Sequence, residues 1–74
     1  MIKIYTKDGC VFCERAKALV VESKKEHEII HMPRDISRDD LMAKFPDART
    51  MPIVTIDNEV IGGYNELKDR VKGD

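Results

Sequence analysis

The chain has 74 residues, 13 of them basic and 14 acidic, and its formal net charge is −1. This length allows one small domain with a thin core. The balanced charges argue against a nucleic-acid binder, which would carry a basic excess. No apolar run has the length of a signal peptide or a membrane-spanning helix, so we expect no membrane partner. The expectation is one soluble, cytoplasmic domain over residues 1–74.

The first half of the chain predicts a strand, a helix and a second strand. Residues 2–5 alternate apolar and polar side chains, which is typical of a short strand. Residues 11–25 follow a helical pattern, and residues 27–31 are centred on two isoleucines and predict another strand. A strand, a helix and a strand with short connections indicate a parallel βαβ unit with a right-handed crossover. The apolar face of the helix comprises Phe12, Cys13, Ala16, Leu19 and Val20.

A second helix is predicted to begin after Ser37. Its hydroxyl can cap the helix, with Asp40 at the third helical position. Ile36 can pack against Leu41 across this start, as in a hydrophobic staple. Pro46 is expected to end the helix.

The last third of the chain predicts a hairpin and a short helix. Residues 53–56 and 59–61 are strand-like runs on either side of Asp57 and Asn58, a dipeptide that suits a tight turn. Two glycines then break the second run. Asn65 is a candidate N-cap for the final helix. The predicted order is β-α-β-α-β-β-α.

Cys10 and Cys13 are the two cysteines of the chain, and they are three positions apart. This C-x-x-C spacing is compatible with a metal site, a structural disulfide or a redox pair. A lasting structural disulfide is disfavoured in the reducing environment that we expect for this chain.

The spacing of Cys10, Cys13, His27 and His31 also matches a Cys₂His₂ zinc site. In a zinc finger the cysteines lie on a hairpin and the histidines on a helix, whereas the reverse is predicted here. Residues four apart on a strand are about 13 Å from each other, too far for both imidazoles to bind one ion. We therefore expect no metal site, and we expect both histidines to be ordinary side chains at the strand ends.

The redox interpretation depends on where the cysteines lie relative to the helix. Unpaired N–H groups and the helix dipole favour a thiolate at a helix N-terminus. Cys10 lies just before the predicted helix, and Cys13 lies one turn along, toward the apolar face. We therefore predict that Cys10 attacks a disulfide and that Cys13 resolves the mixed disulfide. Lys7 adds a nearby positive charge that Asp8 partly offsets.

Three blocks of the sequence resemble the glutaredoxins, in particular the compact dithiol members of the bacterial and phage type. They are YTKDGCVFC (5–13), RTMP (49–52) and IGGYNEL (61–67), in family order and spread over the chain. The resemblance implies a thioredoxin fold, an α/β fold in which a βαβ unit and a β-hairpin form a four-stranded mixed sheet flanked by three helices. It also implies a glutathione-dependent thiol–disulfide oxidoreductase, with glutathione as a cosubstrate and no bound cofactor.

The resemblance further implies a peptide-binding loop with a cis bond before Pro52. In this loop the backbone of Met51 would pair with an extended substrate. Arg49 and Lys7 would receive the glycine carboxylate of glutathione, and the helix start after Gly63 would receive the γ-glutamyl carboxylate. The residues implied to surround glutathione are Lys7, Phe12, Arg49, Thr50, Met51, Pro52, Gly63, Tyr64 and Asn65.

The chain departs from the family pattern at Val11, where proline is usual, at Phe12, where tyrosine is usual, and at Asn65, where aspartate is usual. Asn65 leaves open a redoxin that thioredoxin reductase reduces. Val11 leaves open an iron–sulfur carrier that holds its cluster between two monomers. We expect a monomer whose partners are glutathione and disulfide-containing proteins. Ribonucleotide reductase and thioredoxin reductase are the protein partners that the resemblance suggests.

Overall fold

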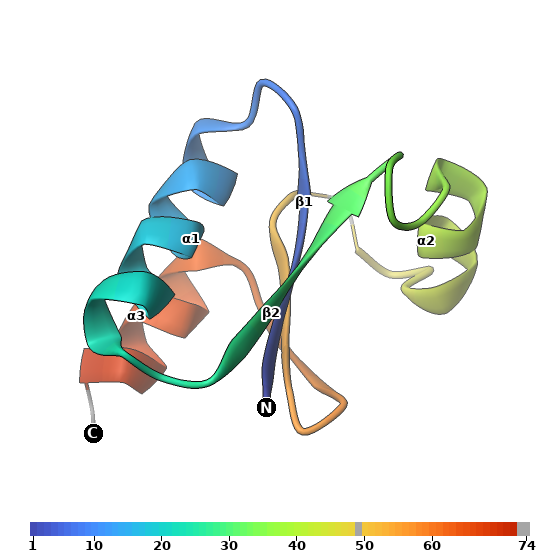
Figure 1. Cartoon of the computed structure of the whole chain (residues 1–74). Coiled ribbons are helices and arrows are strands. Elements are labelled where there is room, and N and C mark those ends of the chain that lie inside the picture. The colour runs from blue at the N-terminus through green and yellow to red at the C-terminus, as the bar shows by residue number, and fades with distance from the viewer. Residues whose placement is uncertain (49, 73–74) are drawn as a thin grey trace.

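The computed structural model describes residues 1–48 and 50–72, and Figure 1 shows its strands and helices. The observed elements are β1 Ile2–Lys7, α1 Val11–Ser23, β2 His27–Met32, α2 Arg38–Lys44, β3 Ile53–Ile56, β4 Glu59–Gly62 and α3 Tyr64–Lys72. Their order is the one predicted from the sequence. Across the described ranges, no helix has the length and apolar character needed to cross a membrane.

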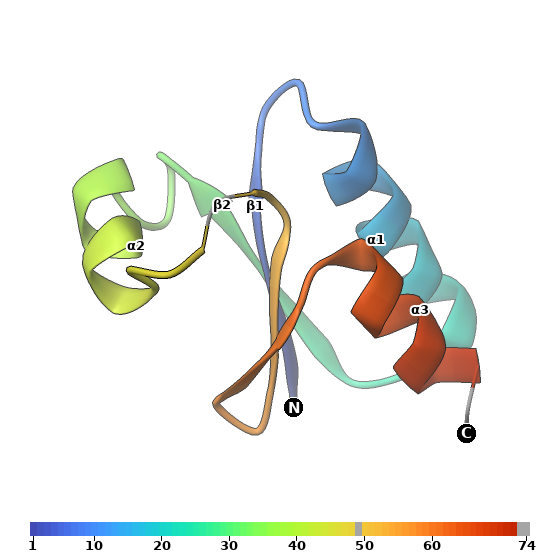
Figure 2. The same ribbon diagram turned by 180° about the vertical axis from the view of Figure 1, so that it is seen from behind.

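The strands form one mixed sheet in the order β2-β1-β3-β4. β1 pairs with β2 in parallel and with β3 in antiparallel, and β3 pairs with β4 in antiparallel. Figures 1 and 2 show α1 and α3 side by side on one face of the sheet and α2 on the other. This arrangement confirms the expected thioredoxin fold.

Alternation along β1 sends its side chains into two separate cores. Ile2 and Ile4 pack with residues of α1 and α3 on one face. Tyr5 points to the other face and packs with Leu41 and Phe45. The rings of Tyr5 and Phe45 meet edge to face, with centroids 4.9 Å apart. This second core fixes α2 against the sheet, and α2 is followed by the loop that leads to β3.

Several element boundaries differ from the predicted ones. β1 and β2 both extend beyond their predicted ends because their pairing continues through Thr6 with His31 and Lys7 with Met32. The first helix was predicted to run to residue 25, but α1 ends at Ser23. Lys24 adopts the left-handed conformation at φ 60° and caps the helix through its N–H, which bonds to the carbonyl of Val21.

The start of α2 and the hairpin follow their predicted local chemistry. The Ser37 hydroxyl accepts the N–H of Asp40 at 3.1 Å, so Ser37 is the N-cap as predicted. Ile36 packs against the core that contains Leu41. Asp57 and Asn58 have φ angles of 52° and 71°, the left-handed values that a two-residue hairpin turn of this kind requires.

The predicted cap of the last helix is wrong. α3 begins at Tyr64, so Asn65 lies inside the first turn rather than ahead of it. The carbonyl of Gly63 accepts the N–H of Leu67 at 3.1 Å and so starts the helical bonding two residues earlier than expected. Asn65 therefore presents its side chain from the first turn of α3.

Candidate active site

Cys10 lies where the chain leaves β1 and enters α1. Asp8 and Gly9 form the connecting turn, and the φ of Gly9 is +69°, a value that favours glycine. Cys10 is the N-cap of α1, and its Sγ accepts the backbone N–H of Cys13 at 3.2 Å. The first turn of the helix thus aims an N–H group at the sulfur. Such a donor favours the thiolate form.

Cys13 lies one turn further along α1 and is completely buried. Burial, as the largest cause, and the side-chain hydrogen bond with Cys10 together raise the pKa of the Cys13 thiol from 9.0 to about 12. The backbone of Lys7 and the charge of Lys17 act in the opposite direction but do not offset burial. Cys10 is partly exposed, and both cysteines are free thiols. The two sulfurs are therefore unequal, one accessible and one held as a buried thiol.

The loop before β3 closes the other side of the site. The peptide bond between Met51 and Pro52 is cis, as the family resemblance implied. The Sγ of Cys10 donates to the carbonyl oxygen of Met51 at 3.8 Å. A second cis bond, between Met32 and Pro33, was not predicted.

A hollow of about 250 Å³ lies beside this loop. Its lining residues are Phe12, Thr50, Met51, Pro52, Gly63, Tyr64, Asn65 and Glu66. All but Glu66 were predicted from the family resemblance. Lys7 is exposed at the end of β1 and is not among the lining residues. Arg49, the remaining predicted residue, lies outside the described residues.

Phe12 and Tyr64 form an aromatic wall of this hollow. Their ring centroids are 5.8 Å apart, and the Cζ of Arg15 lies 5.2 Å from the centroid of Phe12. Phe12 is 50% exposed, so its predicted place on the buried face of the helix is wrong. Phe12 belongs to the first turn of α1, where its ring contacts that of Tyr64 instead of the core between α1 and the sheet. Neither ring contact had a signal in the sequence.

Gly63 lets α3 approach the proline loop closely. A Cβ atom at this position would lie 3.3 Å from the carbonyl oxygen of Pro52, which is closer than most such contacts. A side chain there would push the start of α3 and the loop apart. Gly63, the second glycine of the pair, therefore sets how closely α3 and the proline loop approach at the hollow.

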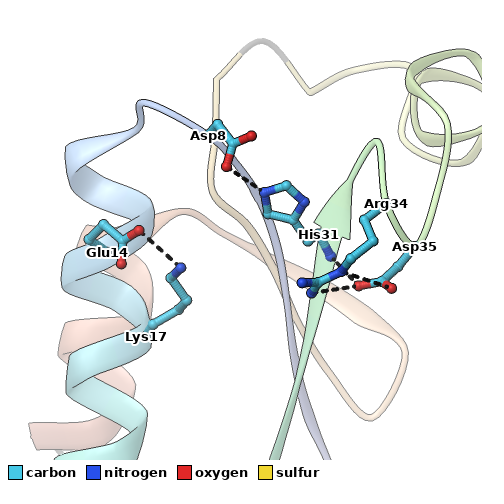
Figure 3. Close-up of polar contacts among 6 residues, drawn as sticks. All are labelled: Asp8, Glu14, Lys17, His31, Arg34 and Asp35. Carbon is cyan, nitrogen blue, oxygen red and sulfur yellow. Dashed lines mark hydrogen bonds and ion pairs between the residues drawn. The ribbon is translucent and has the colours of Figure 1, made fainter.

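The two histidines lie in β2, as predicted, but they differ in what they contact. The Nδ1 of His27 is 2.8 Å from the carbonyl oxygen of Lys25. The Nε2 of His31 is 2.9 Å from the Oδ1 of Asp8, as Figure 3 shows. His27 is thus a strand-end side chain as expected, whereas His31 reaches the turn before Cys10. The parallel pairing of Thr6 with His31 brings them near, and sequence reasoning did not use it.

Comparison with known proteins gives one consistent family. The Glutaredoxin family model matches residues 2–61. Glutaredoxin 3 of Escherichia coli (strain K12) is 32% identical over 66 residues, which cover 89% of this chain and 80% of that protein. Glutaredoxin 1 of Rickettsia bellii is 38% identical in an alignment 74 positions long, which covers 92% of this chain and 74% of that protein.

A solved structure agrees with these relatives. Glutaredoxin 1 from Francisella tularensis, determined in complex with cacodylate, aligns with a TM-score of 0.69 at 31% identity. The alignment covers 99% of this chain and 96% of that one. The fold, the unequal cysteine pair and the family match agree: the chain belongs to the glutaredoxin family of the thioredoxin superfamily, and its chemistry is thiol–disulfide oxidoreduction.

Proposed function

We propose that this protein is a glutathione-dependent oxidoreductase that reduces protein disulfides and glutathione mixed disulfides. The observation that carries the proposal is the hollow beside the loop at Met51, whose carbonyl oxygen is 3.8 Å from the sulfur of Cys10. A thiol peptide bound in this hollow would have its sulfur next to Cys10, and its backbone could pair with that of Met51.

The proposed reaction begins at Cys10. Its thiolate attacks one sulfur of the substrate disulfide, so that a new S–S bond forms to Cys10 and the other half leaves as a thiolate that takes up a proton. Cys13 then loses its thiol proton and attacks the sulfur of Cys10. This second step releases the reduced substrate thiol and closes the bond between the two cysteines.

The environment of Cys13 suits this order of events. The hydrogen bond with Cys10 and the negative charge of that sulfur are among the causes of its raised pKa. Both causes disappear once Cys10 is part of a mixed disulfide. Their loss favours release of the Cys13 proton at the stage when its thiolate is needed.

Two molecules of glutathione restore the dithiol. The first attacks Cys10 and forms a mixed disulfide while Cys13 regains its proton, and the second attacks that mixed disulfide and leaves as glutathione disulfide. Glutathione is thus a cosubstrate, and neither a metal nor a bound organic cofactor takes part in these steps.

We propose that glutathione lies along the hollow between the aromatic wall and the cis-proline loop. Its backbone pairs with that of Met51 in the manner of an added strand. Its γ-glutamyl carboxylate faces the first N–H groups of α3, after Gly63. Its glycine carboxylate is the group that we assign to Lys7 and Arg49. Asn65 offers an amide where a carboxylate would pair with the ligand's ammonium, so we expect weaker binding of that end.

The alternative within the same chemistry is a redoxin that depends on thioredoxin reductase. The observation that favours a redoxin is the amide of Asn65, which lines the hollow where we place glutathione. The protein acceptor that we propose in either case is ribonucleotide reductase, on family grounds. We propose a monomer in the cytoplasm, as the sequence suggested.

The test is to reduce the same disulfide substrate with two reductants in parallel. We expect turnover with glutathione, glutathione reductase and NADPH, and slow turnover with thioredoxin reductase and NADPH. The reverse pattern would establish the redoxin instead. A visible absorbance band in a dimer after anaerobic reconstitution would favour the iron–sulfur carrier.

A further inference from the structure

We propose that His31 is a positioning residue for Cys10 and acts through Asp8. This inference rests on the proposed role of Cys10 as the attacking thiol. Its basis is the contact between the Nε2 of His31 and the Oδ1 of Asp8 at 2.9 Å, which joins the end of β2 to the turn that leads into Cys10.

The backbone of His31 is held firmly from one side. The N–H of Asp35 donates to the carbonyl of His31 at 2.6 Å, and the N–H of His31 donates to the Oδ2 of Asp35 at 2.9 Å. Arg34 in turn contacts that carboxylate at 3.2 Å. Figure 3 shows this chain of contacts running from Arg34 through Asp35 and His31 to Asp8. His31 is therefore anchored at both of its backbone polar groups.

Among the residues that the structure describes, the ring of His31 has one polar partner, Asp8. The side chain of His31 is 17% exposed, and its Nδ1 is buried without a hydrogen-bond partner. All of the hydrogen bonding of the ring is thus directed to Asp8. The side chain of Asp8 is 90% exposed, and within the described part of the chain His31 is its recorded polar contact. A mostly buried ring on an anchored backbone holds an otherwise free carboxylate.

The turn that is held in this way is short. Asp8 and Gly9 alone separate the last residue of β1 from Cys10. Gly9 adopts a positive φ, so the direction of the chain at Cys10 depends on the orientation of this turn. Fixing Asp8 to β2 therefore limits how far Cys10 can move from the N–H of Cys13.

The contact also affects charge near the nucleophile. A carboxylate two residues before Cys10 disfavours a thiolate there, because like charges repel. The ring Nε2–H of His31 donates to this carboxylate, holds it toward β2 and offsets part of its charge. Other charged groups around this end of the sheet are Lys7 on β1, the pair of Glu14 and Lys17 on α1, and Arg34 with Asp35 after β2. Across residues 1–48 and 50–72, none of these groups forms a hydrogen bond or ion pair with Asp8.

The experiment measures the alkylation rate of Cys10 by iodoacetamide across pH, in a Cys13→Ser background where Cys10 is the single thiol. We expect His31→Ala to move the midpoint of the pH profile upward and to lower the rate below that midpoint about threefold, the scale of an exposed ion pair. Asp8→Asn is expected to move the midpoint downward. Adding His31→Ala to Asp8→Asn is expected to have little further effect, because the carboxylate is gone.

His31→Gln serves as the rescue variant, because its amide N–H can still donate to Asp8, and we expect it to restore most of the original profile. His27→Ala is the matched control, because it removes a ring of the same strand that contacts the carbonyl of Lys25 rather than Asp8. An equal effect of His31→Ala with and without Asp8→Asn would overturn the proposal, and so would an unchanged profile.

If His31→Ala fails to fold, the same comparison is made with His31→Leu, which cannot donate to Asp8, and with His31→Gln, which can. The assay contains no glutathione, so its outcome does not depend on which reductant the protein uses.

Discussion

The backbone N–H of Cys13 donates a hydrogen bond to the Sγ of Cys10 at 3.2 Å. One residue thus supplies both the N–H donor at the sulfur of Cys10 and the thiol that we propose attacks the same sulfur in the second step. The helix start makes this possible, because Cys10 is the N-cap and Cys13 provides an N–H that has no partner within the helix. The two sulfurs also differ in exposure, because Cys13 is buried and Cys10 is partly exposed.

The raised pKa of Cys13 predicts a loss of stability at high pH. The pKa is about 12 in the folded protein, against an ordinary value of 9.0. The folded state thus favours the neutral thiol, and this contribution is complete below about pH 9 and is lost as pH rises toward 12. Denaturant unfolding of the reduced protein should show a free energy of unfolding that falls over this range.

Cys13→Ala is the comparison for that measurement. It lowers stability at every pH because it removes buried volume, but the slope between pH 9 and 12 should become shallower than in the reduced protein. Identical slopes in the two proteins would mean that the thiol is not held in its neutral form by burial.

Asp35 is predicted to titrate below the ordinary range. The hydrogen bond from the backbone N–H of His31, followed by that from Arg34, lowers its pKa from 3.8. A depressed pKa contributes stability above about pH 4, and this contribution is lost as pH falls through the folded value. Carboxyl NMR titration should place Asp35 below 3.8, and Arg34→Gln should move it upward. A value at or above 3.8 in the parent protein would contradict the contacts drawn around His31.

Phe12→Ala should weaken binding of the proposed glutathione mixed-disulfide substrate without unfolding the protein. The ring is half-exposed and forms one wall of the hollow with Tyr64. Loss of an aromatic contact of about 1 kcal/mol corresponds to about a fivefold rise in KM for a glutathione mixed disulfide. Val21→Ala, at an exposed position further along α1, is the matched control. Equal KM values for the two variants would show that Phe12 does not contribute to substrate binding.

Leu41→Ala should destabilise the protein by about 2–5 kcal/mol, the usual cost of emptying a fully buried leucine site. Leu41 is completely buried and packs against Tyr5 and Phe45 in the core beneath α2. Met42→Ala, the next residue on the same helix but 37% exposed, should cost far less. Thermal and denaturant unfolding of both variants measures the difference. Similar losses would mean that α2 does not depend on this core.

Most of the fold could be predicted because its signals are local. Ser37 caps its own helix, and Asp57 with Asn58 forms its own turn, so neighbouring residues determine both features. The extra length of β1 and β2 could not be predicted, because it comes from pairing between strands. The start of α3 was misplaced because the backbone carbonyl of Gly63 starts the helix before the side chain of Asn65 is needed.

The candidate site was predictable to a similar extent and for similar reasons. The unequal cysteines follow from their places at a helix start, and the loop at Pro52 follows from the family motif. Glu66 and the contact between Asp8 and His31 were missed. Asp8 and His31 are 23 positions apart, and only the parallel register of β1 and β2 brings them together.

The most direct test of the account compares two single-cysteine variants in the glutathione-dependent reduction of a small glutathione mixed disulfide. Reduction of this substrate needs only the attacking thiol, because a second glutathione can replace the resolving cysteine. We predict that Cys13→Ser keeps this activity and that Cys10→Ser loses it. Loss of activity in both variants would mean that reduction must go through the dithiol, and activity in Cys10→Ser would contradict the assignment of Cys10 as the attacking thiol.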